Sequence, residues 1–224
     1  LGFDGRTGGG EEADQRKKIL QKRQNRFSVN EDLIGAFWQD RPALSCEPVM
    51  ELDVKWAGKS RADKIQEIRT KLKEKGASLF VLTSLDDIAW LLNIRGNDIH
   101  CCPVVLSYLV LDEKEIRLFA NEKAFPDSVK EALAADGVTI YPYDDIYTYV
   151  QTIPEEKKVY LSKSNVNSRL VSNIPDGVTI LNGENLTLLP KAIKNETEVQ
   201  NEKTAHIKDG VAMVKFIHWL KKNV

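Results

Sequence analysis

Cysteine is scarce in this chain of 224 residues, which holds only three. Cys46 stands alone, and Cys101 and Cys102 are adjacent, so the three form neither an even disulfide framework nor a Cys-x-x-Cys metal-binding pair. A reducing compartment fits this usage best, and we expect a cytoplasmic protein. We also expect the cysteines to be small buried hydrophobes.

An excess of charge is also absent, because 32 basic residues stand against 33 acidic residues and the net charge is -1. This balance argues against nucleic acid as a partner. The longest apolar runs, Ile88–Leu92 and Val104–Leu111, are far shorter than the ~20 residues that cross a bilayer, which argues against a membrane protein. The chain begins at Leu1 without a basic and then apolar leader, so we expect no signal peptide and a fragment of a longer protein.

Glycines, charges and prolines divide the first quarter of the chain. Residues 7–27 combine a glycine triplet with a dense charged run and predict a solvated helix or a linker. Residues 32–42 predict a short apolar helix that Pro42 stops, and Pro48 continues the connector that follows. We therefore expect a domain boundary here, with residues 1–45 forming the end of a preceding domain and a linker.

Residues 46–188 alternate helical and strand patterns at short spacing, which is typical of an α/β fold. Ser60 and Asp63 predict the start of a first helix, and Gly76 its left-handed end. Residues 77–83 are a short apolar run rich in strand formers and predict a strand buried on both faces. The elements expected after it are helix 84–92, loop 93–103, an antiparallel hairpin of 104–111 and 115–120, helix 127–135, strand 138–141, helix 144–152, strand 157–161, helix 165–173 and strand 178–181. The hairpin makes the expected sheet mixed, with helices flanking it.

A long helix is expected beyond Pro190. Asn195 and Glu198 predict its capped start, and apolar residues recur at helical spacing as far as Val224. Such a stripe needs a partner surface, which either the α/β unit or a further domain supplies.

The sequence contains no Gly-x-Ser-x-Gly elbow, no His-Glu-x-x-His and no glycine-rich phosphate loop. The one local set of metal-ligating residue types is Asp98 and His100 beside the two adjacent cysteines, and adjacent side chains rarely chelate one ion. His206 and Asp209 share a helix face but lack further ligands. We therefore predict no catalytic residue and no metal site within this chain.

The loop after the second helix carries the best remaining polar candidates. Arg95 precedes a glycine that permits close backbone approach. We expect its guanidinium to bind a carboxylate, which belongs either to a ligand, to a neighbouring domain or to the partner of a structural ion pair. We name Arg95, Asn97 and His100 as candidates for a substrate rim. Ser84 and Asp87 predict the capped start of helix 84–92, and helix capping and the helix dipole explain Asp86 and Asp87.

Four ordered segments resemble the three-domain Xaa-Pro aminopeptidase (aminopeptidase P) family. They are Trp38–Pro42, Ala57–Ser60 with Lys64–Ile65, Asp86–Ile99 with Pro103 and Ser107–Tyr108, and Lys191–Glu198, which continues into Ala205–Ala212. The resemblance implies a creatinase-like amino-terminal α/β domain over residues 46–188. Over residues 189–224 it implies the first helix of a truncated pita-bread metallopeptidase domain.

Complete members of that family remove an N-terminal residue that precedes proline, and they use two divalent metal ions, typically manganese. The implied ligands, two Asp, one His and two Glu, belong to segments that would follow Val224, so none is carried over to this chain. The resemblance thus implies a non-catalytic piece that orients the catalytic domain, shapes substrate access and supports a homodimer. Its partners are the rest of the peptidase chain and proline-containing peptides.

Two alternatives stay open at this point. In the first, the chain is a self-contained module or interaction domain, whose long helix folds back and whose Arg95 loop binds a small ligand. In the second, the chain is an enzyme that acts through Arg95 and His100. Exposure of Met213, Ile217 and Leu220 would speak against the self-contained module.

Overall fold

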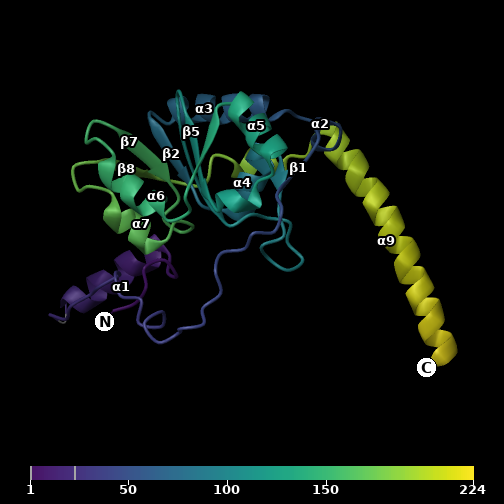
Figure 1. Cartoon of the computed structure of the whole chain (residues 1–224), viewed down its shortest axis with the longest axis horizontal. Coiled ribbons are helices and arrows are strands. Elements are labelled where there is room, and N and C mark those ends of the chain that lie inside the picture. The colour runs from purple at the N-terminus through teal and green to yellow at the C-terminus, as the bar shows by residue number, and fades with distance from the viewer. Residues whose placement is uncertain (1, 23) are drawn as a thin grey trace.

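The computed structural model describes residues 2–22 and 24–224. Its centre is a six-stranded mixed sheet (Figure 1). In spatial order the strands are β6 (Val138–Tyr141), β5 (Ile116–Ala120), β4 (Ser107–Asp112), β2 (Leu79–Leu82), β7 (Lys158–Leu161) and β8 (Thr179–Asn182). The β2–β4 and β4–β5 pairs are antiparallel and the other three pairs are parallel. The predicted mixed α/β sheet and its hairpin are confirmed.

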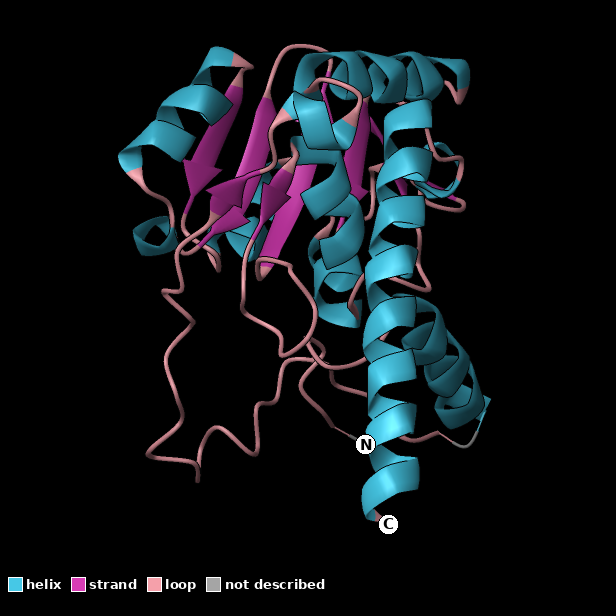
Figure 2. Ribbon diagram, turned by 90° about the vertical axis from the view of Figure 1, so that its right-hand side faces the viewer, coloured by secondary structure: helices cyan, strands magenta, loops and turns pink. Residues whose placement is uncertain are grey.

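Helices cover both faces of this sheet (Figure 2). One face packs against α3 (Arg61–Glu74), α4 (Leu85–Leu92) and α5 (Asp127–Ala135), and the other against α6 (Asp145–Tyr149) and α7 (Ser168–Asn173). Strand β2 serves both cores, because successive side chains of a strand point to opposite faces. Phe80 and Leu82 lie in the first core, and Leu79 and Val81 in the second. The prediction of a strand buried on both faces is therefore confirmed.

The remaining elements are short, apart from the last. They are α1 (Gly10–Lys22), β1 (Met50–Glu51), α2 (Val54–Ala57), β3 (Ile94–Arg95), the 3-10 turns Glu122–Ala124 and Val150–Thr152, α8 (Leu188–Ala192) and α9 (Glu196–Asn223). β1 and β3 form a separate antiparallel pair, so the segment expected to be a loop over 93–103 begins as a strand. None of the helices in the described part of the chain has the length and apolar character that a membrane crossing needs.

Two local predictions are wrong. Residues 32–42 form turns rather than a helix, because Ile34 and Phe37 stay exposed and a short helix needs a packed face to be stable. Ser84 precedes α4 but makes no capping hydrogen bond to it. Its hydroxyl instead accepts the side-chain amides of Asn165, at 3.0 Å, and Asn185, at 2.8 Å. By contrast, α3 begins as predicted, with Ser60 Oγ accepting the Asp63 N–H at 3.1 Å.

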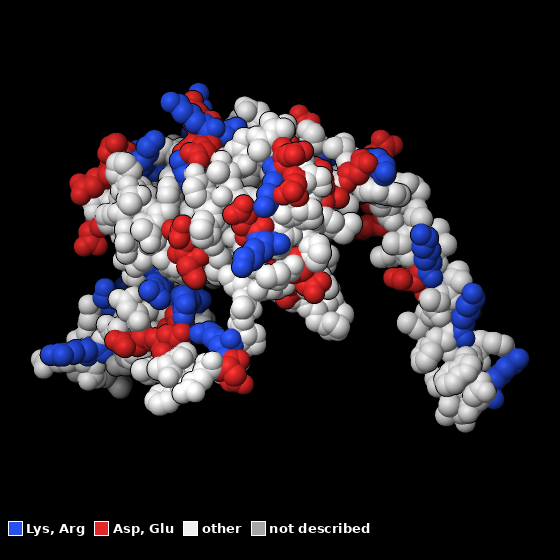
Figure 3. Space-filling view, in the orientation of Figure 1, with Lys and Arg blue, Asp and Glu red and all other residues white. Residues whose placement is uncertain are grey.

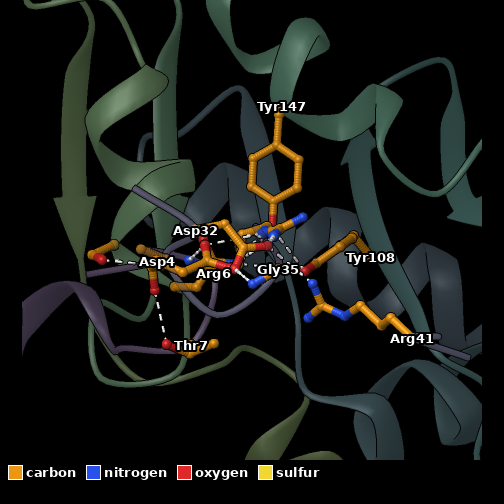
Figure 4. A network of polar contacts seen from close by, with 11 residues as sticks. Asp4, Arg6, Thr7, Asp32, Gly35, Arg41, Tyr108 and Tyr147 are labelled. Carbon is orange, nitrogen blue, oxygen red and sulfur yellow. Dashed lines mark hydrogen bonds and ion pairs between the residues drawn. The ribbon is translucent and has the colours of Figure 1, made fainter. Parts of the chain in front are cut away.

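The N-terminal segment contains a polar network, which Figure 4 draws close to Tyr108 and Tyr147 of the α/β unit. Arg6 donates to Asp4 and, at 2.6 Å, to Asp32, and Arg41 also donates to Asp32. Close by, the hydroxyls of Tyr108 and Tyr147 share a hydrogen bond of 3.0 Å. Burial raises the pKa of both tyrosines, so both stay protonated at neutral pH.

Segment 7–27, for which a helix and a linker were the two alternatives, is therefore not a free linker. Residues 10–22 form α1, whose first two residues are fixed to the α/β unit, because the Gly10 N–H donates to the Val166 carbonyl and the Glu11 N–H to the Lys163 carbonyl.

α9 leaves the α/β unit as an arm (Figure 1). Its 28 residues, all described, include none that is buried. At a rise of about 1.5 Å per residue it extends for about 42 Å. Figure 3 shows uncharged surface between the charged side chains along this arm. Met213, Ile217 and Leu220 are 57%, 43% and 40% exposed. The helix does not fold back on the α/β unit, which speaks against the self-contained module.

Candidate functional site

Three cationic side chains converge on the C-terminal end of α4. The last carbonyls of a helix have no partner within the helix and carry its negative dipole end, so cations stabilise them. The bonds are Arg95 NH1 to the Ala89 carbonyl at 3.0 Å, Lys64 Nζ to the Trp90 carbonyl at 2.9 Å and Arg61 Nε to the Leu92 carbonyl at 2.7 Å. Asn93 follows in the left-handed conformation that ends many helices. This end of α4 is the structural centre of the candidate site.

Lys64 is the most deeply buried of the three cations, with 1% of its surface exposed. Its ammonium also donates to Asn93 Oδ1 at 2.7 Å and lies 4.4 Å from the centre of the Trp90 ring. Burial lowers the pKa of Lys64 to about 8, because an ammonium group loses hydration there. The carboxylate of Glu198 opposes this shift only in part.

Arg61, the first residue of α3, binds residues in β1, in α4 and at the end of α5. Besides the Leu92 carbonyl, its guanidinium reaches Asp136 at 2.7 Å and Glu51 at 2.5 Å. Arg61 and Lys64 both point into the core from α3, although each is a charged residue. A signal for this was present in the sequence, because they precede Ile65 and Ile68 by one turn and so share the apolar face of the helix. Neither residue was predicted from the sequence as part of the site.

Arg95, which was proposed to meet a carboxylate, binds carbonyls instead. Its NH1 donates to Ala89 and to its neighbour Ile94, and among the described residues it has no ion pair. Burial lowers its pKa, and the charge of Glu198 raises it to a smaller extent. Arg95 also lines an open pocket, which leaves it a candidate for contact with a ligand or a neighbouring domain.

This pocket has a volume of about 360 Å³ and lies between α2, α4 and the start of α9. Trp56, Trp90 and Pro103 form apolar walls, and Arg95 and Lys194 are among its charged residues. The indole Nε1 of Trp90 is buried and has no hydrogen-bond partner among the described residues. A larger cavity of about 480 Å³ lies between α1 and α7 and includes none of the predicted rim residues.

The structure does not bring the three rim candidates together. Arg95 lines the pocket, whereas Asn97 and His100 are exposed on the loop beyond it and do not line it. Asp98 fixes this loop, because its Oδ2 accepts the Leu106 N–H at 2.7 Å. Asn97 and His100 stay predictions.

The expected burial of Cys101 and Cys102 is wrong. Both cysteines are exposed at the end of the loop. They lie in a tight turn whose backbone closes through a bond of 3.0 Å from the Cys102 N–H to the Ile99 carbonyl. Cys46 is exposed as well, so the expected burial fails for all three cysteines.

Helix capping is not the main role of Asp86 and Asp87. They lie in the first turn of α4, yet both form ion pairs with Lys191, the Asp87 pair at 2.5 Å. Burial would raise the pKa of Asp86, but the bond and charge of Lys191 lower it overall. The two carboxylates raise the pKa of Lys191 against the effect of its burial. The ion pairs of Lys191 with Asp86 and Asp87 join α8 to α4, just before α9 begins.

The first turns of α9 are fixed to α2. The Asn195 side chain accepts the Glu198 N–H and Glu198 accepts the Asn195 N–H, both at 2.9 Å, so the predicted capping box is confirmed. Asn195 also donates to the Ala57 carbonyl at 2.8 Å, and Asn201 to the Trp56 carbonyl at 2.9 Å. A side chain at Gly58 would clash with Asn195, and its φ of +70° also favours glycine.

Within residues 2–22 and 24–224, no group of three or more His, Cys, Asp or Glu side chains could hold a metal ion. His206 lies exposed on α9, away from the turn that carries His100. The described residues therefore do not fit a two-metal centre, and we derive no metal-assisted step from them.

Residues 40–198 match the Creatinase/Prolidase N-terminal domain family. Xaa-Pro aminopeptidase 1 of Dictyostelium discoideum is 37% identical over 191 residues, which cover 83% of this chain and 29% of that protein. The probable Xaa-Pro aminopeptidase P of Sordaria macrospora is 37% identical over 204 residues, which cover 87% of this chain and 33% of that protein.

The fold is similar to the crystal structure of the X-prolyl aminopeptidase of Caenorhabditis elegans, a cytosolic enzyme with a di-nuclear active site. The TM-score is 0.89 at 32% identity, and the match covers 99% of this chain and 37% of that one. The chain thus spans about a third of the length of the relatives that it matches.

Proposed function

Because the chain belongs to the creatinase/prolidase N-terminal domain family and its relatives are Xaa-Pro aminopeptidases, we propose that it is a non-catalytic part of such an enzyme. The intact enzyme would remove an N-terminal residue that precedes proline. In this proposal, residues 46–188 are the creatinase-like domain, residues 1–45 end a preceding domain and linker, and residues 189–224 open the metallopeptidase domain. The setting would be the cytoplasm, as for the C. elegans enzyme.

The observation that carries this proposal is the contrast within α9. Its first turns are held by side-chain bonds to α2, whereas the residues from Ile207 onward expose a stripe of apolar side chains. An exposed stripe of this size marks an interaction surface. A long helix that is fixed at one end and apolar at the other is suited to orient a second body against the first. We propose that this body is the catalytic domain.

The pocket at the end of α4 supports a second role, in substrate access. It lies beside the fixed start of α9, so a domain carried by α9 would face the Arg95 loop. We propose that Arg95, Asn97 and His100 form part of the rim through which peptides enter. Arg95 is the best placed of the three, because it alone lines the pocket among the described candidates. Support of a homodimer is a further part of this proposal.

Metal ions enter the proposal only through the intact enzyme. The C. elegans relative has a di-nuclear active site, and we propose two divalent ions, manganese, for the intact enzyme here as well. Metal ions of this kind polarise the scissile carbonyl and generate hydroxide. No ligand for them is assigned among the described residues.

An activity measurement tests the first part of this proposal. The purified chain, incubated with an Xaa-Pro peptide and manganese, should release no N-terminal residue. The C. elegans enzyme under the same conditions is the positive control. Turnover by this chain alone would contradict the assignment of a non-catalytic part.

A chimera tests the orienting role. Residues 1–224 would replace the matching third of the C. elegans enzyme, and we expect the chimera to cleave Xaa-Pro peptides. Ile217→Glu with Leu220→Glu should abolish cleavage, because two charges would enter the apolar stripe. Lys203→Glu on the same helix should not. If the chimera with the double substitution is folded and still cleaves Xaa-Pro peptides, the orienting role is refuted.

A further inference from the structure

The segment between β8 and α9 is fastened to α4 through one buried carboxylate. Asp87 is 3% exposed, and its two oxygens have different partners. Its Oδ2 accepts the side-chain amide of Asn185 at 3.0 Å, and the ammonium of Lys191 lies 2.5 Å from its Oδ1. Asn185 precedes α8 and Lys191 lies within it, so one carboxylate holds this segment at two points. We call Asp87, Asn185 and Lys191 the α4 clamp.

Apolar contacts give α8 little support of its own. None of its five residues is buried, and Leu188 and Leu189 are 46% and 63% exposed. Leu186, just before α8, does belong to the core. Lys191 is the one charged side chain of α8, and it supplies the polar attachment of this helix to α4. The position of α8 therefore depends on the clamp.

Any movement at this attachment is enlarged along α9. A short link of three residues, 192–194, joins Lys191 to Asn195, which caps α9. α9 then runs away from the α/β unit, and none of its residues is buried (Figure 1). A helix of this length extends for about 42 Å, so a swing of about 10° at its base moves its tip by about 7 Å. A small displacement of α8 thus becomes a large one at the far end of α9.

The base of α9 has a second anchor on a different element. Asn195 donates to the Ala57 carbonyl and Asn201 to the Trp56 carbonyl, and both acceptors belong to α2. Attachment to one element alone leaves a helix free to turn about that attachment. Attachment to two elements, α2 and α4, defines one direction.

A buried ion pair is suited to set geometry rather than to add stability. The desolvation of two charges offsets much of their attraction, but a buried charge that loses its partner is strongly unfavourable. The Lys191 ammonium is therefore required close to Asp87, which restricts α8 to one arrangement. The second carboxylate bound by Lys191, that of Asp86, is 63% exposed, and exposed pairs contribute little.

We infer that the α4 clamp sets the direction in which α9 leaves the α/β unit, with Asp87 and Lys191 as positioning residues. This inference deepens the orienting role given to α9 and rests on it, because the direction of α9 matters to function only if α9 carries a second body. Without the buried pair, the α/β unit stays folded and α9 swings about its bonds to α2.

The distance between two spin labels tests the clamp in the whole chain. Serine replaces Cys46, Cys101 and Cys102, which are all exposed. Nitroxide-labelled cysteines then replace two exposed residues, by Glu131→Cys on α5 and Lys215→Cys on α9. Double electron–electron resonance on labelled chain diluted with unlabelled chain reports the distance within one chain. We expect a single narrow distance distribution.

Variants of the clamp should change this distribution. Lys191→Met and Asp87→Asn should each broaden it at least twofold, because each breaks the buried pair. Lys191→Arg should keep it narrow, because a guanidinium also pairs with carboxylates. Asp86→Asn should change it little. Lys194→Met is the matched control, since Lys194 is exposed in the same segment and its ammonium donates to the Lys191 carbonyl rather than to a residue of α4.

A double variant separates the direction of α9 from the stability of the fold. Asp87→Asn combined with Lys191→Met leaves no unpaired buried charge and keeps an acceptor for the amide of Asn185. We expect a urea midpoint close to that of the unaltered chain, together with a distance distribution at least twofold broader.

Several results would overturn the clamp. They are a narrow distribution in the folded double variant, loss of folding in that variant, equal broadening in Lys194→Met and a broad distribution in the unaltered chain. Loss of folding would mean that the pair serves stability and not direction. None of these measurements requires peptide cleavage, so failure of the clamp is distinguished from failure of the proposed peptidase role.

Discussion

Helices α4 and α9 both carry apolar residues at helical spacing and reach opposite outcomes. α4 has eight residues, and six of them, Asp87 to Leu92, are buried. α9 has 28 residues and, along its whole described length, none is buried. Cations satisfy the carbonyls at the end of α4, whereas α9 is held only near its start. The difference teaches that an apolar stripe shows that a helix needs a partner but does not show where the partner lies.

The largest effect should come from breaking the cationic end of α4. Arg61→Ala should lower the free energy of unfolding by about 3 kcal/mol, because it leaves the Leu92 carbonyl and two carboxylates without their cation. Urea unfolding followed by circular dichroism measures this. The control is Arg16→Ala, whose exposed pair with Glu12 is worth about 0.5 kcal/mol or less. Equal losses in the two variants would contradict the role given to Arg61.

A matched pair of leucines compares the two helices directly. Leu91 in α4 is fully buried, whereas Leu220 in α9 is 40% exposed. Leu91→Ala should cost about 3 kcal/mol of stability through lost burial and a cavity. Leu220→Ala should change the stability by about 0.5 kcal/mol or less. Thermal and urea unfolding of the two variants suffice, and a large loss at Leu220 would mean that the α9 stripe is covered in the isolated chain.

The pH dependence of stability reports on Lys64. Its pKa is about 8 in the folded state against an ordinary 10.5. Between these values the unfolded chain binds more protons at this site, so the Lys64 contribution to the free energy of unfolding rises with pH, by at most about 1.4 kcal/mol per unit. Below pH 8 both states are protonated and this dependence vanishes.

The measurement for Lys64 is the stability difference between the unaltered chain and Lys64→Met from pH 7 to 10.5. We expect the difference to shift in favour of the unaltered chain as the pH rises. Lys203→Met, an exposed position on α9, should show no such slope. A flat difference for Lys64 would mean that its ammonium is not desolvated in the folded state.

The smallest effect concerns the joint between the two regions. Asn195→Ala removes the cap of α9 and its bond to Ala57, at a cost of about 1 kcal/mol. The effect should be local. Amide hydrogen exchange should become faster over the first turn of α9 and should not change in α4. Asn223→Ala, which removes a bond near the other end of α9, is the control. Unchanged exchange at Glu198 and Val199 would show that the joint does not depend on this cap.

Local signals predicted much of the fold. The start of α3 and the capping box of α9 depend on side chains only three residues away, and a short apolar run rich in strand formers identified β2. Residues 32–42 show the limit of such signals, because their apolar residues stay exposed and the expected helix does not form. The exposed Cys101 and Cys102 show it again, since the shape of a turn and not residue type decided their exposure.

The candidate site was less predictable than the fold. Arg95 was identified from the sequence, but its acceptors are carbonyls of a helix end that is formed only when α4 meets β3. Lys64 and Trp90 were missed, because a lysine on an apolar helix face becomes a buried cap only through contact with a second helix. Lys191 reaches Asp86 and Asp87 across about a hundred residues of sequence.

The sequence by itself determined the α/β class, the mixed sheet, most of the helix ends and the resemblance to Xaa-Pro aminopeptidases, since these depend on local periodicity, capping and ordered motifs. The tertiary structure alone decided which charged residues became buried, which thiols became exposed and in which direction α9 leaves. The physical reason is that burial and ion pairing depend on surfaces brought together from distant segments. Short-range patterns specify that an element forms, and contacts between elements specify what its side chains do.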